Sequence, residues 1–73
     1  MSILPIMAAR EVLRRLLRSG FFIKTIKGNH YKLFNPQTQR TTEVALHPGD
    51  LGRNMLMKII KQSGLTIKEF LDL

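Results

Sequence analysis

The sequence predicts an α+β fold, in which a helix, three antiparallel strands, a second helix and a short third helix follow in order. Helical periodicity occurs on both sides of a stretch rich in β-branched and aromatic residues, and that stretch contains two short polar turns. We expect a two-layer α+β domain, with the helices on one face of the sheet and the other face open to solvent. Residues 1–73 form one expected domain, because so short a chain supports only one small core.

The first helix is expected over residues 8–19. Its apolar residues recur on one stripe, its arginines lie on the opposite side, and Gly20 follows where a helix end favours glycine. The arginines, Arg10 and Arg14 among them, fit either an RNA-binding ridge or an ordinary solvated face, and the pattern leaves both interpretations open.

Three strands are expected over residues 21–27, 30–35 and 41–47. Gly28-Asn29 is a tight-turn signal, so Lys27 should pair with His30. If the second hairpin closes symmetrically around Thr38-Gln39, His30 lies opposite His47 and both histidines share a face. The side chains expected on that cationic face are Lys27, His30, Lys32 and His47.

The opposite face of the expected sheet is apolar, with a few exceptions. Its expected members are Phe22, Ile26, Tyr31, Leu33, Val44 and Leu46. Lys24 also falls on this face, whereas Ile23 and Phe34 fall outside it, so the pattern indicates a β-bulge or an altered register.

The C-terminal third of the chain predicts two helices. After a loop over residues 48–52, apolar residues recur at helical spacing until Gly64, a typical helix-ending residue. Thr66 and Glu69 then match a capping box, which predicts the start of a short final helix.

Composition restricts the class of function. The net charge of +7 favours a polyanionic partner, nucleic acid above all, although an acidic protein or a merely basic surface would also fit. There is no cysteine and no apolar run long enough for a membrane span, and residues 1–5 are too short for a signal peptide. We expect a cytoplasmic protein that is monomeric when free, and charge does not distinguish RNA from DNA.

The two histidines are the candidate catalytic residues. An imidazole can take or give a proton near neutral pH, and RNA cleavage needs only a base for the 2′-OH and an acid for the leaving 5′ oxygen. The lysines beside them would stabilise the phosphate. A histidine in a turn is also commonly just a surface residue. A metal site would need a third ligand, for which Glu43 and Asp50 are weak candidates, so we expect no metal and no cofactor.

Several short motifs occur in a specific order along nearly the whole chain. They are Leu4-Pro5, Arg10-Glu11-Val12-Leu13, Gly20-Phe21, Gly28-Asn29-His30-Tyr31, Val44-Ala45-Leu46-His47, Ile59-Ile60-Lys61-Gln62-Ser63-Gly64-Leu65-Thr66 and Glu69-Phe70-Leu71. In this order they resemble the HicA-type mRNA interferases, the toxins of toxin–antitoxin pairs. The sequence departs from the family pattern at Asn29, where serine is usual, at Ala45, where proline is common, and at Asn54-Met55, in place of Gly-Thr.

The resemblance implies a fold like a double-stranded RNA-binding domain, αβββα, which agrees with the order of elements predicted above. It also implies a type II toxin, a metal-independent endoribonuclease that cleaves mRNA and is neutralised by a HicB-type antitoxin covering the active site. It implies that His30, held in the turn by Gly28 and Asn29, is the essential residue. Our leading hypothesis adds His47 as a second proton carrier, with Lys27 and Lys32 as phosphate contacts. An RNA-binding module without chemistry and a subunit that docks an acidic protein are the alternatives.

Overall fold

The computed structural model describes residues 4–73, and residues 1–3 of the opening segment lie outside the described part. Its elements are β1 (Met7–Ala8), α1 (Ala9–Arg18), β2 (Phe22–Lys27), β3 (His30–Asn35), β4 (Arg40–Ala45), β5 (Asp50–Leu51), α2 (Arg53–Ser63) and α3 (Ile67–Leu71). The predicted α+β order is confirmed. β1 and β5 were not predicted, because two residues are too few to show a periodicity.

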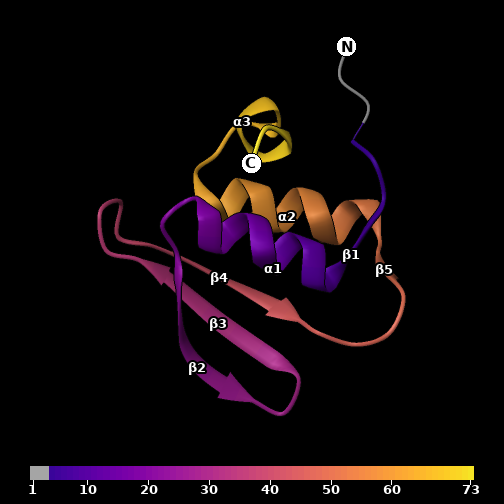
Figure 1. Ribbon diagram of the computed structural model, residues 1–73, viewed down its shortest axis with the longest axis horizontal. Coiled ribbons are helices and arrows are strands. Elements are labelled where there is room, and N and C mark those ends of the chain that lie inside the picture. Colours follow the sequence, from indigo (N-terminus) through magenta and orange to yellow (C-terminus); the bar gives the residue numbers. More distant parts are fainter. Residues whose placement is uncertain (1–3) are drawn as a thin grey trace.

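The main sheet is an antiparallel meander in the order β2-β3-β4, and the helices cover one of its faces (Figure 1). Figure 1 shows α1 and α2 over the sheet and α3 beyond them. The short strands β1 and β5, which lie just before α1 and α2 in the chain, pair with each other. Within residues 4–73, no helix is long and apolar enough to cross a membrane. None of the helices in residues 4–73 covers the second face of the sheet, which we call the helix-free face, as the sequence predicted.

Helix α1 occupies nearly the predicted range because its apolar stripe has a core to pack on. Ala9, Val12 and Leu16 are buried. Ser19 caps the end of the helix, its hydroxyl donates to the Leu16 carbonyl over 2.8 Å, and Gly20 follows at φ 110°. Glycine is the residue type that adopts such a positive φ without strain.

The first hairpin has the predicted turn, and it contains the β-bulge that the pattern indicated. Lys27 pairs with His30 and Thr25 with Lys32, and the register shifts at Lys24. The bulge turns Phe22 to the helix-free face, opposite Phe34. The assignment of Phe22 to the core was therefore wrong, and its side chain is 48% exposed.

Ile26 was also assigned to the core, and this too was wrong. It pairs with Tyr31 on the helix side of the sheet, but 56% of it is exposed. β2 is the edge strand farthest from β4, and the helices make most of their contacts with β4. Position on the apolar face therefore did not guarantee burial.

The second hairpin has a different register from the one predicted. Asn35 pairs with Arg40, so each β3 residue lies opposite a residue two positions earlier than expected, and His30 faces Ala45 instead of His47. The Gln39 amide donates to the Asn35 carbonyl over 2.8 Å, and Gln39 has φ 61°. This closes the four-residue loop over residues 36–39. Strand β4 consequently ends at Ala45, before His47.

The new register is consistent with the packing of β4 on the helices. Thr42 and Val44 are buried, and the Thr42 hydroxyl donates to the Gln62 side chain of α2 over 2.8 Å. Because side chains alternate along a strand, Glu43 between them points to the helix-free face. The register therefore decides which side chains accompany His30.

The C-terminal helices end and begin as predicted. Gly64 caps α2 in the left-handed conformation, at φ 80°. Thr66 and Glu69 form the capping box that starts α3, with hydrogen bonds of 3.0 and 2.8 Å. Phe70 of α3 is fully buried. The core that joins the layers consists of Leu4, Ala9, Val12, Leu16, Phe21, Leu33, Val44, Leu51, Leu56, Ile59, Ile60 and Phe70.

Candidate active site

A shallow hollow of about 290 Å³ lies on the helix-free face of the sheet. Its lining residues come from all three strands of the meander, namely Thr25, Lys27, His30, Lys32 and Glu43. The sequence predicted that Lys27, His30 and Lys32 would share a face, and the strand pairing places them together. All of the lining side chains are exposed, so the hollow is accessible to a large substrate.

The turn before His30 is held by the neighbouring strand segment. Gly28 adopts φ 62°, which a two-residue hairpin turn requires and glycine tolerates. The Asn29 carbonyl accepts a hydrogen bond of 2.7 Å from the Leu46 amide, just after the end of β4. This bond attaches the turn to the third strand, so His30 starts β3 from a fixed position.

Among the described residues, His30 makes one side-chain hydrogen bond, which joins its Nδ1 atom to Oε2 of Glu43 over 2.9 Å. The two side chains are 56% and 48% exposed. An ionised carboxylate only accepts hydrogen bonds, so Nδ1 must carry the proton that is shared. In the neutral ring this leaves the Nε2 lone pair free to accept a proton.

Glu43 is the functional candidate that sequence reasoning missed. The sequence offers it only as a weak metal ligand, and the predicted register places it opposite Phe34, four residues along the strand from His30. In the observed register Glu43 pairs with Lys32, and it is therefore a diagonal neighbour of His30 across the strands. The polar residues of the loop over residues 36–39 were the available signal for the turn between the strands. The predicted strand pairing differs from the observed pairing by two residues, and this difference was enough to miss the contact between His30 and Glu43.

This arrangement combines a proton acceptor with positive charge. Lys27 lies directly opposite His30, and Lys32 is two residues further along the same strand. An imidazole with a free nitrogen can move a proton at neutral pH, and two ammonium groups can bind an anionic phosphate. Among residues 4–73, no group of three His, Asp or Glu side chains could hold a metal ion.

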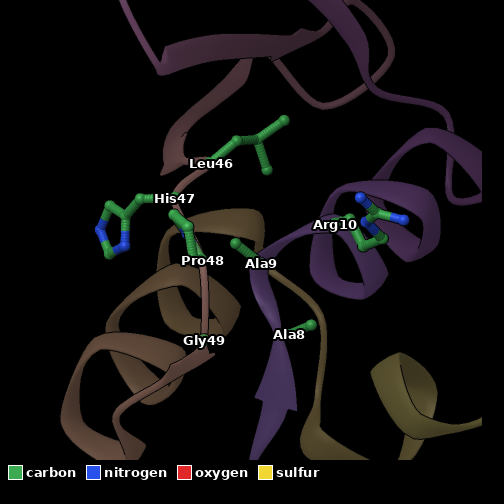
Figure 2. Close-up of a pocket in the computed structure, with 7 residues that line it drawn as sticks. All are labelled: Ala8, Ala9, Arg10, Leu46, His47, Pro48 and Gly49. Carbon is green, nitrogen blue, oxygen red and sulfur yellow. The ribbon is translucent and has the colours of Figure 1, made fainter.

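His47 lines a different hollow, of about 420 Å³, at the start of α1 (Figure 2). Figure 2 shows that Leu46 and His47 leave the chain on opposite sides, with Leu46 on the side nearer Arg10. The predicted pairing of His30 with His47 is wrong. His47 lies two residues beyond Ala45, or roughly 7 Å further along an extended chain. Its role as a second proton carrier stays a prediction.

Arg10 and Arg14 belong to helix α1, on the helical side of the sheet. Arg10 lines the hollow of Figure 2 together with His47. Arg14 donates to Glu11, as does Arg15, and these hydrogen bonds lower the Glu11 pKa to about 2. The same contact raises the pKa of Arg14. Neither arginine lines the hollow of His30, and their contact with RNA stays a prediction.

Comparison with known protein families identifies a family that the chain matches. The model of a family described as the HicA toxin of bacterial toxin-antitoxin systems matches residues 9–65. This range covers well over half of the chain and contains every residue that lines the hollow of His30. No curated protein matches the sequence.

Proposed function

The chain belongs to the HicA toxin family of bacterial toxin–antitoxin systems, and we propose that it is a metal-independent endoribonuclease that cleaves mRNA. One observation carries the proposal. His30 is bonded through Nδ1 to Glu43 and lies in an exposed hollow with Lys27 and Lys32. A proton acceptor is thus placed beside two cations that can bind a phosphate, an arrangement suited to cleavage of an RNA backbone.

In the proposed reaction His30 acts on the ribose 2′-OH. Its Nε2 atom takes the hydroxyl proton, the 2′ oxygen bonds to the adjacent phosphorus, and the bond from phosphorus to the 5′ oxygen breaks. The products are a 2′,3′-cyclic phosphate and a 5′-hydroxyl end. The 5′ oxygen takes its proton either from the protonated ring of His30 or from His47, and a variant of His47 separates these two routes.

The lysines supply the electrostatic part of the reaction. Lys27 and Lys32 would contact the phosphate, whose negative charge increases as the 2′ oxygen attacks. Lysine suits this role because its ammonium group is a compact charge with three donors. Gly28 and Asn29 contribute through the backbone, since their turn places His30 beside Lys27.

The family implies a cognate antitoxin, and we propose a HicB-type protein that covers the helix-free face of the sheet. A protein with a net charge of +7 is best matched by an acidic partner surface. Covering this face would remove His30, Lys27 and Lys32 from RNA together. We also propose that the toxin acts in the cytoplasm, where its mRNA substrate is found.

The test compares three proteins purified in the same way: the wild type, His30→Ala and His47→Ala. Each is incubated with RNA in EDTA, and both cleavage and gel retardation are measured. We expect the wild type to cleave, and His30→Ala to bind RNA but cleave it at least about 100-fold more slowly, since it lacks the proton acceptor. An unaltered cleavage rate in His47→Ala would assign the second proton to His30, whereas a loss of about 100-fold would assign it to His47.

Two results would contradict the proposal. If His30→Ala cleaves RNA at the wild-type rate, the histidine is not the catalytic residue. If the wild type retards RNA and leaves it intact, the protein is an RNA-binding module without chemistry. His30 is more than half exposed, so its substitution should not unfold the chain, and circular dichroism of each variant checks this.

A further inference from the structure

We propose that Glu43 is a positioning residue that selects the reactive tautomer of His30; this inference rests on the proposed function. The carboxylate accepts a hydrogen bond of 2.9 Å from the Nδ1–H group, so Nε2 is the nitrogen left free for the substrate. Without this partner the imidazole can rotate about its side-chain bonds, and either ring nitrogen can carry the proton. Glu43 thereby acts through His30 and does not itself touch RNA.

The placement of Glu43 is a consequence of the strand register. Its neighbours in the chain, Thr42 and Val44, are buried toward the helices, so Glu43 must project to the opposite face. His30 begins the adjacent strand β3, and its position is fixed by the turn bonded to Leu46. The backbone therefore places the imidazole of His30 and the carboxylate of Glu43 close together, independently of the contact between the two side chains.

The charges around the pair favour a carboxylate at this position. Lys27 faces His30 from β2, and Lys32 pairs directly with Glu43 from within β3. Lysine offers only donors, so neither lysine can accept the Nδ1 proton. Thr25 is the remaining lining residue of the hollow, and no hydrogen bond joins it to His30 among the described residues. Among the described residues that line the hollow, Glu43 is thus the one that accepts a hydrogen bond from the His30 ring.

The catalytic test uses two substitutions of the same residue. Glu43→Gln keeps an acceptor oxygen and should keep most of the cleavage rate, whereas Glu43→Ala removes the acceptor and should lower kcat about tenfold, with little change in KM. Two exposed control substitutions should leave cleavage unaltered. They are Asp72→Asn, which removes one negative charge just after α3, and Thr41→Ala, on the same strand as Glu43.

A spectroscopic measurement tests the positioning directly. In ¹⁵N-labelled protein at alkaline pH, where the imidazole is neutral, the ring nitrogen shifts report which nitrogen carries the proton. We expect a His30 ring protonated at Nδ1 in the wild type and in Glu43→Gln, and loss of this preference in Glu43→Ala. His47 provides an internal reference, whose spectrum should be the same in all three proteins.

Each other outcome would overturn the inference. If Glu43→Ala keeps the Nδ1-protonated ring, Glu43 does not orient His30. If Glu43→Gln is as inactive as His30→Ala, the carboxylate itself takes the proton and is catalytic. A wild type that cleaves no RNA would overturn the proposed function and the catalytic part of this inference, while the nitrogen spectra would still decide whether Glu43 sets the tautomer.

Discussion

Lys27 and Lys32 are distinguished from the other lysines by their position beside His30. Both line the hollow of His30, and neither forms an ion pair among the described residues. Lys68 of α3, by comparison, is paired over 3.0 Å with Asp72, the residue that follows the helix. If both lysines contact phosphate, as proposed, replacing either one should weaken RNA binding.

Replacing either lysine by glutamine should weaken RNA binding and reduce its dependence on salt. The slope of log affinity against log salt should fall by about 0.7 on single-stranded RNA for each phosphate that the variant no longer binds. The His30→Ala background keeps the RNA intact during the measurement. Lys58→Gln, an exposed change on α2, is the matched control, and an equal slope change there would contradict phosphate binding confined to the hollow.

At the scale of elements, the helix ends were the most accurate part of the sequence interpretation. Gly20, Gly64 and the Thr66 capping box occupy the positions predicted for them. Such signals act over one turn of the chain, so they depend little on distant packing. Strand ends were less accurate, since β4 stops at Ala45 when the loop to β5 begins.

Gly64 permits a test of how a single glycine ends α2. Gly64→Ala should lower the free energy of unfolding by about 1–2 kcal/mol, because φ is 80° and an L-residue is strained there. Gly64→Asn should be less destabilising, since asparagine tolerates the left-handed region better. Both variants add the same Cβ, 2.8 Å from Nε of Arg40. Equal destabilisation in urea unfolding would therefore mean that the approach to Arg40, not φ, sets the cost.

At the scale of the whole molecule, α3 connects the end of the chain to the core. Phe70 is fully buried, and the Arg15 guanidinium of α1 donates to the carbonyls of Phe70 and Leu71 over 3.2 and 2.8 Å. The same guanidinium lies 5.7 Å from the centre of the Phe70 ring. These contacts fix α3 against α1 although α3 itself has only five residues.

Phe70→Ala should therefore unfold much of the molecule. Truncating a buried phenylalanine costs about 3–5 kcal/mol, which approaches the whole stability of a small domain. Phe22→Ala, on the helix-free face, removes an identical side chain that is 48% exposed, and should cost about 1 kcal/mol. Thermal unfolding followed by circular dichroism compares the two, and similar destabilisation would show that α3 contributes little to the core.

The α+β class, the order of the helices and the Lys27–His30 pair all follow from local signals. Periodicity, caps and a two-residue turn each act within a few residues, so they can be recognised without knowing the packing. His30 was identified in this way. The surroundings of His30 were only partly predicted. The positions of Lys27 and Lys32 beside it depend on the first hairpin, whereas the position of Glu43 depends on the register of the second hairpin.

Packing against the helices settled what local signals left open. The four-residue loop tolerates more than one closure, and burial of Thr42 and Val44 against the helical layer accompanies the observed one. That register brings Glu43 to His30 and leaves His47 beyond the end of β4. A shift of two residues keeps every side chain on its face, so the alternating pattern is the same in both registers and only long-range contacts distinguish them.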